Sequence, residues 1–111
     1  MTALRQRLGK PHRNPSHLVH IRSLPCMICG MPAIAHHLLR PWNGVRGMSR
    51  KSGDENAVPL CDPDHRSLHA AGDEDEWFKR RLGSMDAGRD RAKGLWNTSP
   101  YYKRLVSEGK D

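Results

Sequence analysis

The first half of this chain has no acidic residue. Residues 1–53 contain nine Lys or Arg and no Asp or Glu, whereas residues 54–111 contain ten Lys or Arg and all twelve acids, a net charge of −2. An even spread of charge would indicate no more than a solvated surface. A half-chain of one sign is typical of a protein that binds a polyanion.

Aromatic residues and long apolar stretches are also scarce. The 111 residues include one Phe, two Tyr and three Trp, and hydrophobic residues make up 36% of the chain. No apolar run approaches the roughly 20 residues of a membrane span, and the N-terminus has no signal-peptide stretch, so we expect a cytoplasmic protein without membrane contact. One small domain with so little apolar material has a small core, and a bound metal would supply stability that the core lacks.

Cysteine is limited to three residues, and this odd number argues against a disulfide framework. Cys26 and Cys29 form a C-x-x-C pair followed by Gly30, which can adopt the tight turn that such a pair needs, and Cys61 lies just before an expected helix. A redox role for the pair would need a βαβ setting, which the flanking sequence does not indicate. We therefore expect a zinc ion at Cys26, Cys29 and Cys61.

The stretch from Cys61 to His69 predicts a helix that serves two metal sites. Pro63 suits the first position of a helix, and Asp62 before it is a good N-cap. His65 and His69 are four residues apart and share one face, as a pair of metal ligands must. Asp64 points about a quarter-turn away, back towards Cys61. The alternative is a surface helix with two solvated histidines.

A pair of adjacent histidines, His36 and His37, ends a short apolar strand expected at residues 33–35. Neighbouring side chains on a strand point to opposite faces. If His36 faces a metal, His37 faces elsewhere, which suits one ligand and one general base better than two ligands of one ion. A second strand at residues 57–60 leads into Cys61, so the order of elements is β-β-α.

The loop between the two strands, residues 40–53, carries cations separated by glycines, with Trp42 among them. This composition suits a loop that follows a phosphate backbone. The expected nucleic-acid contacts are Arg40, Arg46, Arg50 and Lys51.

The flanking segments complete one domain at residues 16–100. Residues 1–15 read as a flexible basic arm, and residues 101–111 as a C-terminal tail. Further helices are expected at residues 17–23 with Ser16 as N-cap, at 73–82 and at 85–96. We expect His12, His17 and His20 at the surface or partly packed.

These elements together resemble the HNH, or His-Me finger, nucleases, in the zinc-knuckle version of small phage and prophage HNH-like domains. The resemblance covers about residues 17–100 and depends on order and spacing more than on any single motif. The matching elements are Pro25–Gly30 (PCMICG), His36-His37, Gly47–Asp54 (GMSRKSGD), Val58–Cys61 (VPLC), the turn from His65 to His69, Gly72-Asp73-Glu74, and Leu95-Trp96 with Ser99-Pro100.

The resemblance implies an α+β fold with a small ββα-metal core, stapled by a structural zinc and flanked by helices. It implies an endonuclease that hydrolyses DNA phosphodiester bonds with little sequence preference, using one divalent ion, Mg²⁺ or Mn²⁺, at the scissile phosphate. Carried over by position, His37 is the general base, and His36, His65 and His69 bind the ion. Phage recombination or replication proteins are the expected protein partners.

Two positions depart from the family pattern. Related chains read Cys-x-x-His-His at the turn, whereas position 64 is Asp here, so the fourth zinc ligand is Asp64 or a water. The residue that orients the base is Asn56, five residues before Cys61, or Asp54, which matches the closer subfamily. We favour Asn56, and a purely structural turn residue is the alternative for both.

A zinc-stapled DNA-binding module without catalysis is the alternative function, because a C-x-x-C pair with basic residues suits it as well. His37 separates the two hypotheses, since a binding module has no need for a second histidine beside a metal-binding one. RNA is the weaker alternative substrate, because a basic surface attracts either polymer. The oligomeric state and the form of the nucleic acid stay open.

Overall fold

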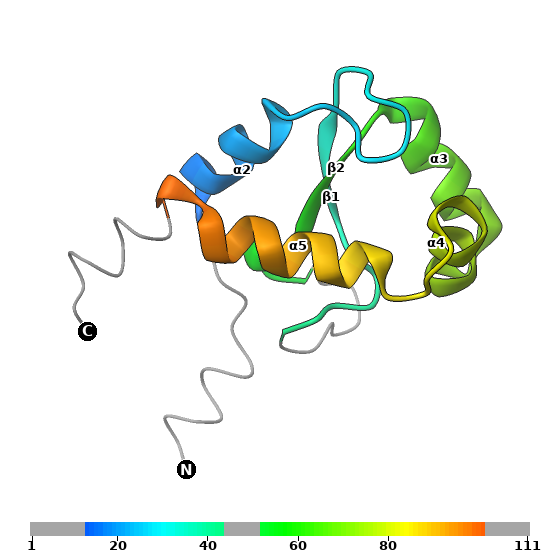
Figure 1. The fold of residues 1–111 in the computed structure, drawn as a ribbon. Helices are drawn as coiled ribbons and strands as arrows, with labels where there is room; N and C mark the ends of the chain where they lie inside the picture. Colours follow the sequence, from blue (N-terminus) through cyan, green and yellow to red (C-terminus); the bar gives the residue numbers. More distant parts are fainter. Residues whose placement is uncertain (1–12, 44–51, 102–111) are drawn as a thin grey trace, which may run out of the picture.

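The computed structural model describes residues 13–43 and 52–101, and within them the fold is α+β, with one two-stranded antiparallel sheet and four helices. The elements are α2 (Pro15–Arg22), β1 (Ile34–His37), the 3-10 turn η1 (Asp54–Asn56), β2 (Ala57–Leu60), α3 (Asp62–Ala71), α4 (Glu74–Leu82) and α5 (Ala87–Thr98). In Figure 1 the hairpin stands between α2 on the left and α3 with α4 on the right, and α5 crosses the lower part of the hairpin. No helix in these ranges is long and apolar enough to cross a membrane.

The hairpin brings the two adjacent histidines into regular strand geometry. Strands β1 and β2 pair in the register Ile34↔Leu60, Ala35↔Pro59, His36↔Val58 and His37↔Ala57. Pro59 has no N–H to donate, and it is tolerated because its hydrogen-bonding side points away from β1, where its carbonyl accepts the N–H of Met27 at 3.0 Å. Strand β1 begins one residue later than expected and includes both histidines, so the alternation of side chains applies to them directly.

The helix that follows β2 begins at Asp62 with Cys61 as its N-cap, which corrects the expectation that Asp62 is the cap. Pro63 lies in the first turn, where its missing N–H costs nothing. The helix ends at Gly72, whose φ of 81° lies in the left-handed region that glycine adopts most easily. Asp73 then caps α4 by accepting a hydrogen bond from the N–H of Glu76.

The core lies where α3, α4 and α5 meet the hairpin. Its buried members include Val58, Leu68, Trp77 and Phe78. Helix α5 approaches α4 closely here, because Gly88 leaves room for the Phe78 ring: a Cβ at position 88 would lie 2.5 Å from Phe78 Cε2. The core therefore fixes α3 against the hairpin, which sets the positions of His65 and His69 relative to His36.

Three expectations about the flanks are corrected. Helix α2 begins at Pro15, and its N-cap is Asn14, whose side chain accepts a hydrogen bond from the N–H of His17, so Ser16 is not the cap. Asn14 is buried, so residues 13–15 belong to the folded unit, while residues 1–12 lie outside the described part of the chain. His17 is fully buried against Trp96 and is not a surface residue.

Candidate metal centre

Three cysteines and one aspartate converge between the turn after α2 and the first turn of α3. Their four ligand atoms all lie within 4.8 Å of one another. Cys29 Sγ is 3.5 Å from Cys61 Sγ, and Asp64 Oδ2 is 3.4 Å from Cys26 Sγ and 3.2 Å from Cys61 Sγ. Four-coordinate zinc with bonds of about 2.3 Å to sulfur separates two sulfurs by about 3.8 Å, so only a small outward shift would fit the ion.

The backbone around the C-x-x-C pair is arranged to support thiolate ligands. Gly30 takes a φ of 82°, and its N–H donates to the Cys26 carbonyl at 2.9 Å, which closes the turn. The N–H of Ile28 points at Cys26 Sγ from 3.4 Å. Burial raises the pKa of Cys26, but backbone N–H groups of Cys29, Cys61 and Ile28 outweigh it, so the net pKa lies below its ordinary value of 9.0.

The close packing of these four acidic side chains makes it costly to ionise all of them together. The Asp64 backbone N–H lowers the pKa of Cys61, but burial and the side chains of Asp64, Cys29 and Cys26 raise it more, to about 12. A divalent ion removes this conflict, because it stabilises every ligand in its anionic form. Asp64 completes a set of three sulfurs and one oxygen, and this donor set suits zinc.

The second cluster consists of His36 from β1 with His65 and His69 from α3. The three ring centroids lie 4.5–5.5 Å apart, and His36 Nδ1 is 3.0 Å from His65 Nδ1. Two nitrogens bound to one zinc at about 2.0–2.1 Å would lie about 3.3 Å apart, so the spacing fits a shared ion. Burial, then the neighbouring His36 and His69, lowers the pKa of His65, which keeps its ring neutral and able to bind metal.

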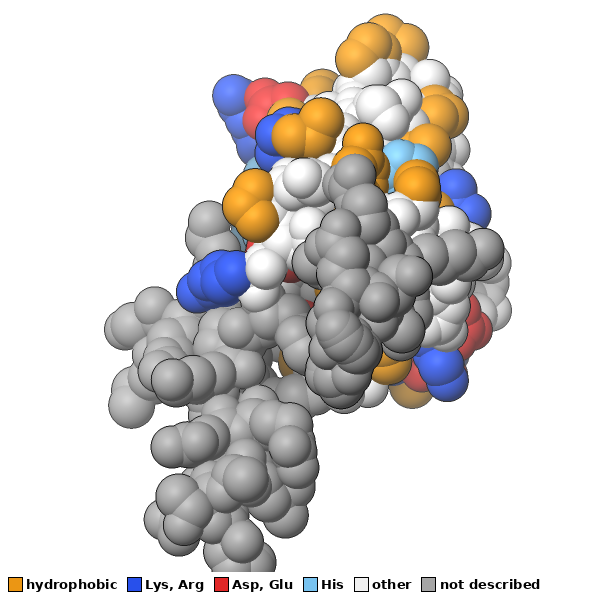
Figure 2. Space-filling view, turned by 90° about the vertical axis from the view of Figure 1, so that its left-hand side faces the viewer, with side chains coloured by type: hydrophobic (Ala, Val, Ile, Leu, Met, Phe, Trp, Pro, Cys, Tyr) orange, Lys and Arg blue, Asp and Glu red, His pale blue; other side chains and the backbone are white. Residues whose placement is uncertain are grey.

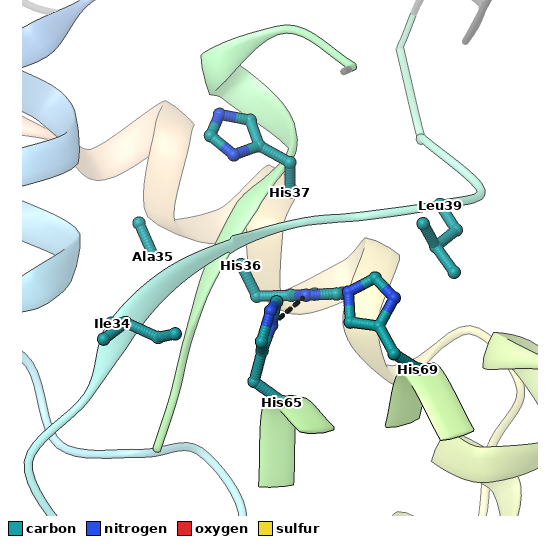
Figure 3. A pocket seen from close by; sticks show the side chains of 7 residues that line it. All are labelled: Ile34, Ala35, His36, His37, Leu39, His65 and His69. Carbon is teal, nitrogen blue, oxygen red and sulfur yellow. Dashed lines mark hydrogen bonds between the residues drawn. The ribbon is translucent and has the colours of Figure 1, made fainter. Parts of the chain in front are cut away.

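This cluster opens onto a cavity of about 280 Å³ (Figure 3). The lining residues are Ile34, Ala35, His36, His37, Leu39, His65 and His69. Figure 3 shows His36 directed towards His65 and His69, whereas His37 projects from the other side of β1. The strand alternation therefore sends the two adjacent histidines to different surroundings, as the sequence predicts.

His37 contacts Asp54, which corrects the preference for Asn56. His37 Nε2 lies 2.9 Å from Asp54 Oδ1, and Asp54 Oδ2 accepts the N–H of Asn14 at 2.7 Å. Burial raises the pKa of Asp54, but these hydrogen bonds, with the nearby charges of His37 and Arg13, give a net pKa below the ordinary value of 3.8. Asp54 is therefore an ionised carboxylate held between β1 and the start of α2.

The Asn56 side chain is used for a different purpose. Its Oδ1 accepts the N–H groups of Trp42 and Asn43 at 2.9 and 3.2 Å, and its Nδ2 donates to the Asn43 carbonyl at 3.0 Å. Both polar atoms of the Asn56 side chain therefore hydrogen-bond to backbone groups of Trp42 and Asn43, in the segment that follows β1. Asn56 fastens the start of the loop and does not orient His37.

Glu74 belongs to the site, although sequence reasoning assigned it no role. It is 3% exposed, and its Oε2 lies 2.9 Å from His36 Nε2. Burial raises its pKa, but hydrogen bonds from His36, Leu39 and Arg40 outweigh burial, and the net pKa falls below 4.5. An acidic residue in the first turn of a helix is usually explained by its favourable interaction with the helix dipole. The one signal in the sequence that could have identified Glu74 as a site residue is its place in the motif Gly72-Asp73-Glu74.

Little of the expected nucleic-acid surface falls within the described residues. Arg40 is exposed and lies 3.4 Å from Asp75, whereas Arg46, Arg50 and Lys51 lie outside the described ranges. On the face seen in Figure 2, the basic side chains of the described residues form separate groups, with hydrophobic side chains between them. The phosphate-contacting loop therefore stays a prediction.

Comparison with known proteins gives one curated relative and one family. The uncharacterized protein YdfU of Escherichia coli (strain K12) is 42% identical to this chain over 50 residues, which are 44% of this chain. The aligned part is only 14% of the length of YdfU. No solved structure matches the chain. The profile of the family described as "Protein of unknown function (DUF968)" matches residues 5–86, which include both clusters, His37, Asp54 and Glu74, and the chain therefore belongs to this family.

Proposed function

We propose that this protein is a metal-dependent endonuclease of the HNH, or His-Me finger, type that hydrolyses phosphodiester bonds in DNA. The observation that carries the proposal is the pair His36 and His37. One side chain joins His65 and His69 in a cluster with metal-binding geometry, and the next contacts a buried carboxylate on the opposite face of the strand. A ligand beside a general base explains this division of roles.

The order of elements supports the same proposal. An antiparallel hairpin leads directly into α3, and the ligands come from β1 and from one face of α3. We propose that β1, β2 and α3 form a ββα-metal core, that Cys26, Cys29, Cys61 and Asp64 hold a structural zinc, and that the catalytic domain extends from residue 13 to about residue 100. The zinc would hold the start of α3 against the turn before β1.

His37 has the contacts that a general base needs. Because the Asp54 carboxylate only accepts hydrogen bonds, His37 Nε2 carries a hydrogen towards it, and Nδ1 is left with the lone pair that can take a proton from water. Asp54 stabilises the positive charge that the ring gains in that step, as the aspartate of a catalytic triad does. This assigns Asp54 the orienting role.

His36, His65 and His69 would hold the divalent ion. When bound, the ion supplies charge stabilisation to the scissile phosphate and to the leaving oxygen. Mg²⁺ and Mn²⁺ are the proposed ions, with phosphate and water oxygens completing the coordination. Three imidazoles without a carboxylate suit transition metals better than Mg²⁺, so we expect Mn²⁺ to support activity at lower concentration than Mg²⁺.

The proposed substrate is DNA, with RNA the weaker alternative, and the expected location is the cytoplasm. The basis for a nucleic-acid substrate is the charge of residues 1–53, which include nine basic and no acidic residues. Arg40, Arg46, Arg50 and Lys51 are the proposed phosphate contacts. The resemblance to phage and prophage domains extends the proposal to recombination or replication proteins as partners.

A DNA-binding module without catalysis is the second candidate, and the sulfur cluster together with the basic composition of residues 1–53 favours it. It explains Cys26, Cys29, Cys61 and Asp64 equally well. It gives no reason for the cluster of three histidines or for a buried carboxylate behind His37. The nuclease accounts for both features, and we prefer it for this reason.

The test is nicking of supercoiled plasmid by the full chain with Mn²⁺ or Mg²⁺, wild type against His37→Ala. Loss of a general base typically lowers the rate about 10²–10⁴-fold, while binding to DNA should be unchanged because no metal ligand is lost. His20→Ala, a change in a partly exposed histidine of α2, is the matched control and should nick like the wild type. DNA binding without nicking by the wild type, or undiminished nicking by His37→Ala, would contradict the proposal.

A further inference from the structure

The buried carboxylate of Glu74 reaches the metal cluster from the first turn of α4. It is 3% exposed and lies behind His36, on the side away from His65 and His69. Its neighbours on α4, Asp75 and Glu76, are half-buried and exposed. A fully buried acid beside a ring that has metal-ligand geometry requires a specific reason, because burial of an unpaired charge is costly.

The hydrogen bonds of Glu74 determine which nitrogen of His36 carries hydrogen. Glu74 Oε1 accepts the N–H of Arg40 at 3.0 Å, and Oε2 accepts the N–H of Leu39 at 3.0 Å. Oε2 also lies 2.9 Å from His36 Nε2. Two backbone N–H donors stabilise Glu74 as a carboxylate, which only accepts hydrogen bonds, so His36 Nε2 is the donor in the third contact.

The other nitrogen of His36 then has a free lone pair. Nδ1 lies 3.0 Å from Nδ1 of His65, inside the cluster of three histidines. The ring is fixed from both sides, because Nε2 is held by a carboxylate that two backbone groups anchor. A rotation of the ring would break the contact with Glu74.

We propose that Glu74 is a positioning residue that holds His36 as its Nε2–H tautomer, so that Nδ1 is the atom that binds the divalent ion. The inference depends on the proposed function only in that the three histidines bind an ion, and it does not depend on hydrolysis. A carboxylate behind a ligating histidine orients the ring and makes it a stronger donor, and its loss typically weakens metal affinity about 10–100-fold.

Glu74→Gln is the informative change because it keeps the size of the side chain. An amide has one oxygen and one NH₂ group where Glu74 has two acceptors, so three donors can no longer all be satisfied. If the NH₂ group faces His36, Nε2 must accept, and the hydrogen moves to Nδ1, where it blocks the ion. Glu76→Gln is the matched control, since Glu76 is exposed in the same helical turn and pairs with Arg80.

The experiment uses the full chain with one equivalent of zinc, which the thiolates take first. Two-bond ¹H–¹⁵N spectra of the protein before Mn²⁺ is added should show His36 protonated at Nε2. Electron paramagnetic resonance titration should show that Mn²⁺ binds about 10–100-fold more weakly to Glu74→Gln than to the wild type or to Glu76→Gln. Wild-type His36 protonated at Nδ1, or unchanged Mn²⁺ affinity in folded Glu74→Gln, would overturn the proposal.

If Glu74→Gln does not fold, the tautomer of His36 in the wild type decides the question alone. Failure of the nuclease proposal gives a different result: no nicking, with Mn²⁺ binding and the Nε2–H tautomer retained. A wild-type protein that binds no Mn²⁺ would refute the ion site itself, and this inference with it.

Discussion

Acidification should destabilise this protein through His17, which is buried where α2 meets α5. The side chain is 0% exposed, its Nδ1 pairs with Ser99 Oγ at 2.9 Å, and its ring packs edge-on against Trp96. Among the described residues its Nε2 has no hydrogen-bond partner. Burial, with a smaller effect from nearby His20, lowers the pKa of His17 from 6.5 to about 4.

The sign of the effect follows from proton uptake in the two states. The unfolded chain protonates His17 near pH 6.5 and the folded chain only near pH 4, so the unfolded state binds more protons in this window. The stability that neutral His17 gives is therefore complete above pH 6.5 and is lost as the pH falls towards 4. The full loss is about 3 kcal/mol, of which about 2 kcal/mol falls between about pH 7 and pH 5.

Urea unfolding of wild type and His17→Gln at these two pH values measures the effect. Glutamine does not titrate but can still bond to Ser99, so the variant should lose about 2 kcal/mol less than the wild type on acidification. Protonation of metal ligands affects both proteins alike and cancels in the difference. His20→Gln, in the same helix, should keep the wild-type pH dependence. Equal pH dependence of wild type and His17→Gln would refute the reasoning.

Three further outcomes follow from the proposed sites. Strong chelation should unfold the domain, because metal-binding free energy is folding free energy in such sites, and a folded, reduced sample without zinc would contradict the sulfur cluster. Binding to duplex DNA should weaken with salt, log K falling by about 0.9 per phosphate contact for each tenfold rise; removal of residues 1–12 should reduce this slope, and a flat salt response of the wild type would contradict the electrostatic reading. Excess Mn²⁺ should partly restore nicking by His36→Ala but not by His37→Ala, and the reverse pattern would exchange their roles.

Local patterns predicted the helices and strands in the described ranges to within about two residues. The hairpin and α3 were predictable because apolar runs, Pro63 and Gly72 fix them from within the sequence. The two clusters were predictable for a related reason: metal ligands occur at spacings of three or four residues that a turn or a helix brings together. The α+β class follows from these elements.

The partners of the histidines were less predictable, because they depend on contacts between distant segments. Asp54 reaches His37 from 17 residues away, and Glu74 reaches His36 from 38 residues away. Asn56 matched the family spacing, but spacing does not show that its amide is already used by the chain after β1. From the sequence alone His17 looks like a surface residue, because its burial depends on Trp96 of α5, which is 79 residues away along the chain.

Two pairs of consecutive residues supply side chains to different parts of the site. On β1, the two-residue repeat of a strand sends His36 to the ion cluster and His37 to Asp54. On α3, successive residues are about 100° apart, so Asp64 joins the sulfurs while His65 joins the imidazoles. Because adjacent residues share a rigid backbone, a metal held by the sulfurs would fix α3 in the orientation that the histidine cluster requires. The proposed zinc site and the proposed catalytic site are therefore expected to be coupled through one turn of helix.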